Sequence, residues 1–238
     1  MGLLHQCRTA WSRHHRSAGF GIHSPHAFRF VTEVLGNRSH FYAYSDIEQM
    51  RREVIAATGS KWPHSKVMTF RQAKMLFRIT NHFNPTCLLQ VGVTDAIDTA
   101  TMLAVSTGSH LWLHEPSLDS NPAAKQVITP LTDRVTHSSD LQTVLGGYLA
   151  AHGDEPPFVL ISHIGSEADA QLLDTILTPL LTSQAVVLMR HMANDERVRA
   201  LWDTCCQALG NGQTFTNGRR GILIANPKLQ REHFDIWL

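Results

Sequence analysis

The stretch CLLQVGVTDAIDTATMLA, residues 87–104, predicts a buried strand, a turn with one glycine and then a helix. A strand that turns through glycine into a helix is the shape of a nucleotide-cofactor loop. Such loops usually contain two or three glycines, whereas this one contains only Gly92. It also has Asp95 where a cofactor would approach. The stretch therefore raises two alternatives, a working cofactor site and the remnant of one.

The chain from residue 86 onward has the pattern of an α/β fold. Its short apolar runs are TCLLQVG, HLWLHE, RVTHSS, PFVLISHIG and AVVLMRH. The helical stretches between them are DAIDTATMLAVST, NPAAKQVIT, DLQTVLGGYLAA and EADAQLLDTILTPLL. Apolar strands that alternate with helices predict a Rossmann-like, doubly wound parallel sheet covered on both faces. The pair Asn217–Gly218 between two later strands predicts a terminal antiparallel hairpin.

The first third of the chain is predicted to be helical. Ser45 and Glu48 would form a capping box, and Pro25 would occupy the first position of its helix. The predicted start and stop residues of the helices here and of a later one are Ser24 and Gly36, Ser45 and Gly59, Thr69 and Pro85, and Asn194 and Gly210. We therefore expect three parts: residues 1–18 as a basic, flexible arm, 19–84 as a helical cap, and 85–238 as the α/β domain.

Composition narrows the function classes. The chain has 238 residues and a net charge of +1, which does not favour nucleic-acid binding driven by electrostatics. We expect no membrane span, because no apolar run reaches about 18 residues. With no export signal, free thiols and a cytoplasmic location are expected for its four cysteines. Its 15 histidines are scattered, and no metal site is predicted.

Three segments together carry a resemblance to a known family. They are GFGIHSPHAFRFV, KMLFRIT and LLQVGVTDAIDTA. They resemble the H-G-[IV]-H-S-P-F, L-L-F-R-L and E-L-G-T-S-x-G segments of a bacterial group of class I S-adenosylmethionine-dependent methyltransferases with an N-terminal helical cap. The resemblance extends from about Gly19 to Phe234. It implies a seven-stranded sheet with one late antiparallel strand, and S-adenosylmethionine as the cofactor.

The resemblance places the cofactor loop on residues 90–96. Gln90 stands where the family has an acid for the amino group of the cofactor, so a charge-assisted hydrogen bond is lost. Gly92 is retained, Thr94 follows it in the loop, and Ala96 replaces a second glycine. Asp95 would repel the cofactor carboxylate, or it would serve as a favourable residue at the start of a helix.

Two further acids match cofactor contacts of the family. Glu115 ends the second strand and would accept hydrogen bonds from the ribose hydroxyls. Asp140 follows the third strand and would meet the adenine amino group. The alternatives are a solvated acid at Glu115 and a plain helix cap at Asp140, a role that Ser139 would also suit.

The fourth and fifth strands depart furthest from the family pattern. In VLISHIGSE, Ser162 replaces an aspartate and His163 follows it. In LMRHMAND, Arg190 and His191 stand where acids are frequent. Divalent cations such as Mg²⁺ need oxygen ligands, so metal-dependent transfer is not expected. His163 and His191 are candidate proton acceptors, with histidines that merely face water as the alternative.

Two hypotheses from different classes follow. The first is a methyltransferase-like protein that transfers methyl groups to a small molecule without a metal. The second is a catalytically degenerate protein of this fold that acts as a binding or regulatory module through its N-terminal helices, as a homodimer or with another protein. Nicotinamide-dependent oxidoreduction is disfavoured by the single glycine and the hairpin. Phe41, Tyr42 and Tyr44 would line a pocket for a flat substrate or pack the cap onto the domain.

Overall fold

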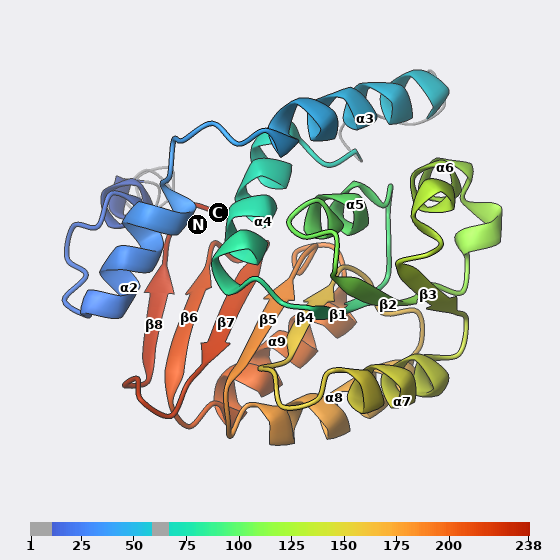
Figure 1. Cartoon of the computed structure of the whole chain (residues 1–238). Coiled ribbons are helices and arrows are strands. Elements are labelled where there is room, and N and C mark those ends of the chain that lie inside the picture. Colours follow the sequence, from blue (N-terminus) through green and yellow to red (C-terminus); the bar gives the residue numbers. More distant parts are fainter. Residues whose placement is uncertain (1–10, 59–66) are drawn as a thin grey trace.

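The computed structural model describes residues 11–58 and 67–238, and its centre is one mixed sheet. Its strands are β1 Cys87–Val91, β2 His110–His114, β3 Val135–Ser138, β4 Phe158–Ile161, β5 Ala185–Met189, β6 Gly212–Thr216, β7 Gly221–Ala225 and β8 Glu232–Asp235. They lie in the order β3-β2-β1-β4-β5-β7-β6-β8 (Figure 1). Strand β7 is antiparallel to β5 and β6, and the other pairings are parallel.

The predicted doubly wound sheet and its terminal hairpin are confirmed, with one strand more than the seven expected. Strands β6 and β7 pair from Thr216↔Gly221, and Asn217 with Gly218 lies in the turn between them. The additional strand β8 pairs in parallel with β6 at the edge of the sheet. Its sequence EHFD is short and three of its four residues are polar, so no apolar run predicts it.

Helices cover both faces of the sheet (Figure 1). One face carries α4 Phe70–Phe83, α5 Ile97–Leu103 and α6 Pro122–Ile128, with α3 Ala43–Thr58 packed outside them. The other face carries α7 Leu141–Ala151, α8 Glu167–Leu180 and α9 Glu196–Ala208. Short 3-10 turns occur at Leu118–Ser120 and Thr129–Leu131. The sheet therefore separates two apolar cores, as a parallel sheet with near-continuous apolar strands requires.

The predicted helix starts are partly right. Ser24 caps α2 Pro25–Arg29, which continues as a π-helix over Phe30–Leu35 to Gly36. Thr69 and Gln72 form a reciprocal capping box at α4. The capping box expected at Ser45 is wrong, because α3 begins at Ala43. Ser45 lies inside that helix, and its hydroxyl donates to the carbonyl of Tyr42, the residue before the helix.

Two other helix ends complete the comparison. Glu48, the expected partner of Ser45, instead forms ion pairs with Arg51 and Arg52. Asp195 rather than Asn194 caps α9, and that helix ends at Ala208, shortly before Gly210. Gly59, the expected stop of α3, lies outside the described residues.

The N-terminal helices pack on the β6–β8 end of the sheet and on α5 (Figure 1). Residues 11–17 are helical, and Arg13 forms an ion pair of 2.7 Å with Asp235. Phe30 packs against Phe215 of β6, with ring centroids 5.0 Å apart. Residues 19–58 and 67–84 thus contribute side chains to one apolar core shared with the sheet.

The aromatic segment HFYAYSD packs the cap rather than forming a pocket. The rings of Phe41 and Tyr44 contact each other and both contact Phe77 of α4. Tyr42 is fully exposed to solvent. The packing interpretation is confirmed for Phe41 and Tyr44.

Candidate functional site

A cleft of about 1110 Å³ opens at the carboxyl ends of β1, β4 and β5. Strand order reverses between β1 and β4, and this switch point is where ligands bind in open α/β sheets. The lining residues are Val93, Thr94, Asn121, Ser162, His163, Glu167, Ala170, Gln171, Asp174, His191, Asn194, Asp195, Glu196, Arg197, Ala200, Leu201 and Thr204. Within the described ranges, the helices before β1 contribute no side chain to this lining.

Four of the predicted site residues meet at this cleft, namely Thr94, Ser162, His163 and His191. Gly92 lies directly behind His163. Its φ is 76°, and a β-carbon on it would lie 2.5 Å from the carbonyl oxygen and 2.7 Å from the backbone nitrogen of His163. Glycine is required here because the backbone of His163 approaches so closely, a contact that the sequence did not reveal.

Gln90 lies beneath the cleft and is turned into the fold. The side chain is completely buried, and its Oε1 accepts a 2.8 Å hydrogen bond from the Thr99 hydroxyl of α5. Its Nε2 donates to the carbonyl of Gly92 at 3.4 Å. The amide therefore connects β1 to α5 and does not line the cleft.

Asp95 is also turned away from the cleft. Its carboxylate is completely buried and accepts hydrogen bonds from the backbone of Met68 at 2.6 Å and of Ile97 at 3.1 Å. Burial chiefly, and Asp98 nearby, raise the pKa of Asp95. The expectation that it faces a cofactor carboxylate is corrected, whereas its role at the start of α5 is confirmed through Ile97. Ala96, which replaces a family glycine, is in the left-handed region with φ 57°.

Ser162 and Arg190 are joined by an aspartate that the sequence did not single out. The buried carboxylate of Asp98 in α5 forms an ion pair with the Arg190 guanidinium. Ser162 donates to the same Oδ2 at 3.2 Å, and Thr99 N donates to Oδ1 at 3.0 Å. Ser162 and Arg190, which stand where the family that the chain resembles has acids, are thus the two side chains that contact the buried Asp98. A buried arginine needs an acidic partner, so an arginine directly after an apolar strand is the feature of the sequence that indicates a buried acid nearby.

Glu115 and Asp140 lie along the same edge of the sheet, outside the cleft lining. Glu115 is buried, and its carboxylate accepts hydrogen bonds from Val93 N at 2.8 Å and Ser117 N at 2.9 Å. Asp140 is the N-cap of α7, accepting from Thr143 N at 2.9 Å. The hydrogen bonds from Thr143 lower the pKa of Asp140. The cap interpretation is therefore confirmed for Asp140.

His163 is held by an acid from the start of α9. Its Nδ1 lies 2.6 Å from Oδ2 of Asp195; the His163 side chain is 59% exposed and that of Asp195 is 9% exposed. Asp195 also caps α9, accepting at Oδ1 from Arg197 N and Val198 N, each at 3.1 Å. Burial alone would raise the pKa of Asp195, but hydrogen bonds from Val198, His163 and Ile164 N lower it overall.

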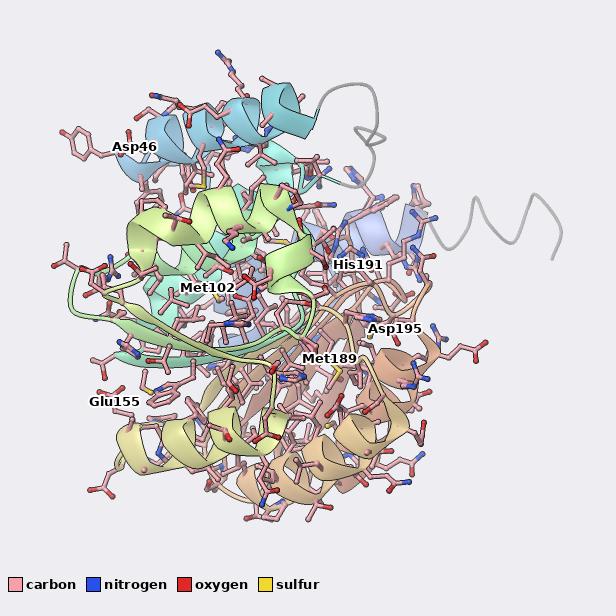
Figure 2. The ribbon with its side chains drawn as sticks, turned by 90° about the vertical axis from the view of Figure 1, so that its right-hand side faces the viewer. Asp46, Met102, Glu155, Met189, His191 and Asp195 are labelled. Carbon is pink, nitrogen blue, oxygen red and sulfur yellow. The ribbon has the colours of Figure 1, made fainter. Side chains whose placement is uncertain are left out.

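His191 shapes the loop between β5 and α9. Its φ of 59° places a non-glycine residue in the left-handed region, and its carbonyl accepts from Asn194 N at 2.8 Å and Asp195 N at 3.0 Å. Figure 2 shows His191 and Asp195 near each other at this edge of the molecule. Burial first, and then Arg190, lowers the pKa of His191 to about 4. Its buried Nε2 has no hydrogen-bond partner among the described residues.

Two further properties of the described residues bear on the site. No group of three or more histidine, cysteine, aspartate or glutamate side chains is arranged to hold a metal ion in residues 11–58 and 67–238. Over the same ranges, none of the helices has the length and apolar character needed to cross a membrane.

Comparisons with known proteins place this architecture. No protein-family model matches the chain, and no curated protein sequence matches it significantly. Solved structures do match. An O-methyltransferase from Bacillus cereus in complex with SAH superposes with a TM-score of 0.52 at 14% identity, covering 83% of this chain and 96% of that chain.

Two other solved structures give the same result. A putative caffeoyl-CoA O-methyltransferase from Staphylococcus aureus has a TM-score of 0.51 at 13% identity, with 83% of this chain and 98% of that chain covered. The O-methyltransferase TomG from Streptomyces achromogenes, in complex with SAM, has a TM-score of 0.50 at 14% identity, with 79% and 91% covered. The strand order, the single antiparallel strand and these superpositions agree, and the chain has the fold of the class I S-adenosylmethionine-dependent methyltransferases.

Proposed function

We propose that this protein transfers a methyl group from S-adenosylmethionine to a small molecule without a metal ion. The observation that carries the proposal is the cleft at the β1/β4 switch point of a sheet with this fold. Two of the similar solved structures are complexes with SAM and with SAH, which supports the choice of cofactor.

The residues around the cleft fit such a cofactor. The cleft volume of about 1110 Å³ lies slightly above the usual range for small-molecule sites, which leaves room for a cofactor and an acceptor. The unpartnered Nε2 of His191 is a buried polar atom at its edge. The residues proposed to form the cofactor site are Thr94, Glu115, Asp140 and Ser162, which would contact the cofactor, together with Gly92 in the loop and the buried Gln90 that bonds to it. When bound, S-adenosylmethionine supplies an electrophilic methyl group on a positively charged sulfur.

Each proposed binding residue has a defined task. Thr94 and Ser162 line the cleft and offer hydroxyl groups to a bound ligand. The bonds from Val93 and Ser117 hold the Glu115 carboxylate at the end of β2, where its remaining acceptor capacity suits ribose hydroxyls. Asp140 at the next strand end suits an adenine amino group. Gln90 and Gly92 support this loop from below.

Metal-free transfer is supported by the residues beside the cleft. The Arg190 guanidinium lies where an acid would be needed for a divalent cation, and its charge is directed to Asp98. A divalent cation requires oxygen ligands such as carboxylates, and the positive charge of arginine would repel it. Charge stabilisation must then come from the fixed groups of the protein.

The test is calorimetric titration with S-adenosylmethionine and with S-adenosylhomocysteine. We expect micromolar binding of both by the unmodified chain, and at least a tenfold loss in Glu115→Ala. Asp154→Ala, which removes an exposed acid from the loop between α7 and β4, is the matched control and should bind normally. Equal affinity in Glu115→Ala would remove that residue from the site, and absence of binding by the unmodified chain would reject the proposal.

A second candidate function is favoured by one observation. Gln90 and Glu115 are buried and already bonded within the chain, which is what a binding or regulatory module without a cofactor would retain. The exposed rings of Trp11 and Phe20, both 66% exposed, would then serve a protein partner or a second copy of the chain. No titration heat with either ligand, together with dimers in size-exclusion chromatography that Trp11→Ser dissociates, would favour this candidate.

A further inference from the structure

The pair formed by His163 and Asp195 has a defined hydrogen-bond direction. Asp195 receives backbone N–H groups from Arg197, Val198 and Ile164, all of which favour its ionised form. An ionised carboxylate only accepts, so the proton between the two side chains belongs to Nδ1 of His163. In the neutral ring Nε2 is therefore unprotonated, with a lone pair available to accept a proton.

The backbone on both sides holds this pair in place. Gly92 lies against the nitrogen and carbonyl of His163, so any side chain at position 92 would displace the histidine. The left-handed His191 directs its carbonyl to the N–H of Asp195. Strained backbone such as that of His191 is concentrated at functional sites, and here it helps to position Asp195 against His163.

His163 borders the part of the cleft between α8 and α9, which none of the proposed cofactor residues lines. Its Nδ1 edge is against Asp195, so the exposed part of the ring carries Nε2. Between α8 and α9 the cleft is lined by small and apolar side chains, by polar ones and by charged ones, namely Ala170, Ala200, Leu201, Gln171, Thr204, Glu167, Asp174, Glu196 and Arg197. A small, polar acceptor with a hydroxyl group suits such a lining.

We propose that Asp195 is the positioning residue of a general-base pair, with His163 taking the proton of an acceptor hydroxyl. The inference rests on the proposed function. The acceptor oxygen forms a bond to the methyl carbon as the methyl–sulfur bond breaks, its electron pair remaining on sulfur. The hydroxyl proton goes to Nε2 of His163 and from there to water, so charge and atoms balance. The substrate class is therefore a small hydroxyl-bearing molecule.

The first test reads the tautomer of His163 directly, by NMR of the imidazole nitrogens in the full-length protein. We expect the Nδ1–H tautomer in the unmodified chain at a pH where the ring is neutral. In Asp195→Asn the side-chain oxygen keeps capping α9, and the amide group faces His163, so the ring should shift to the Nε2–H tautomer. Glu196→Gln removes the neighbouring charge of α9 and should leave the tautomer unchanged.

Two results would overturn the proposal. One is an Nε2–H tautomer in the unmodified chain, and the other is a tautomer that Asp195→Asn does not alter. Asp195→Ser supplies a second variant, because serine caps a helix but is too short to reach His163. Circular dichroism of both variants establishes that α9 is retained, so a change of tautomer is separated from loss of the helix.

A second measurement separates failure of this inference from failure of the proposed function. S-adenosylhomocysteine should bind Asp195→Asn as tightly as the unmodified chain, because Asp195 acts on the acceptor side. With transfer of labelled methyl groups to simple phenols, Asp195→Asn should lower kcat by about 10²-fold or more with little change in KM for the cofactor. If the unmodified chain binds neither ligand, the proposed function fails whatever the tautomer. If it binds and the tautomer is Nε2–H, only the general-base pair fails.

Discussion

Arg190 and Asp98 show how a substitution at one strand end is balanced from another element. The guanidinium is at the end of β5 and the carboxylate is in α5, and both are buried. Two charges removed from water are stable only as a pair, because each alone keeps the full cost of desolvation. Arg190 therefore acts in the interior of the fold, where it neutralises the buried carboxylate of Asp98.

We expect Arg190→Met to lower the free energy of unfolding by about 3–5 kcal/mol, because Asp98 is left as an unpaired buried charge. The double variant Arg190→Met with Asp98→Leu should recover most of that loss, since both charges are gone. Urea unfolding at pH 7 measures both. If the double variant is as unstable as the single one, the ion pair is not what holds these two elements together.

His191 predicts a dependence of stability on pH. Its pKa is lowered from 6.5 to about 4 by burial and by Arg190, so the unfolded chain binds a proton more readily than the folded one. The stability it contributes is complete above pH 6.5 and is lost as the pH falls toward 4. Because the ring is partly exposed, we expect a loss of about 1–2 kcal/mol over that window.

The matching variant is His191→Asn, because asparagine tolerates the left-handed backbone and does not titrate there. Between pH 7 and pH 4.5, urea unfolding of this variant should lose about 1–2 kcal/mol less than the unmodified chain. Parallel pH dependences of the two proteins would show that another group is responsible.

The loop between β1 and α5 is fixed by a contact with the β4 end. Gly92 has φ 76°, and an added β-carbon would meet the His163 backbone. Gly92→Ala should therefore lower the free energy of unfolding by about 2–4 kcal/mol, from backbone strain and overlap together. Gly153 also has a positive φ, of 60°, but has open space around it, so the expected loss in Gly153→Ala is about 1 kcal/mol. Equal losses in thermal unfolding would exclude the overlap with His163.

The sequence pattern predicts helix caps at both Thr69 and Ser45, but the structure has a cap only at the first of these two. Thr69 caps α4 through a reciprocal box, whereas Ser45 lies inside α3. Thr69→Ala should lower the free energy of unfolding by about 1 kcal/mol, and Ser45→Ala by less than about 0.5 kcal/mol. If Ser45→Ala lowers the free energy of unfolding more than Thr69→Ala does, the capping box that the sequence predicts at Ser45 is supported.

Local patterns predicted the parts of the fold that local forces determine. The apolar runs of β1 to β5, the Asn217–Gly218 turn and the Thr69 cap each depend on neighbouring residues, and each is present. The polar strand β8 was not predictable in this way, because it forms only through pairing with β6.

The contacts that define the site are between residues far apart in the chain. Asp98 and Arg190 are 92 positions apart, and His163 and Asp195 are 32 apart. The sequence identified Ser162, His163, Arg190 and His191 as unusual strand ends, but no spacing revealed their acidic partners. The sequence pattern leaves two alternatives for Asp95, the cleft and the start of a helix. The direction of a side chain in a turn depends on what packs above it, here the backbone of Met68.

The two cores of the molecule meet at the sheet, and the cleft lies at the edge they share. A ligand that binds there contacts loops anchored in both cores, so its binding free energy should add to the stability of the entire fold. At a concentration 100 times its Kd, S-adenosylhomocysteine should stabilise the chain by about 2.7 kcal/mol. For a protein of this size that corresponds to a rise in Tm of roughly 5–10 °C in differential scanning calorimetry. NADH is the control ligand, because it shares the adenosine group but belongs to the oxidoreductase alternative, and it should leave Tm unchanged. An equal rise with NADH would mean that the edge recognises adenosine alone, and a rise with NADH only would replace the methyltransferase proposal with oxidoreduction.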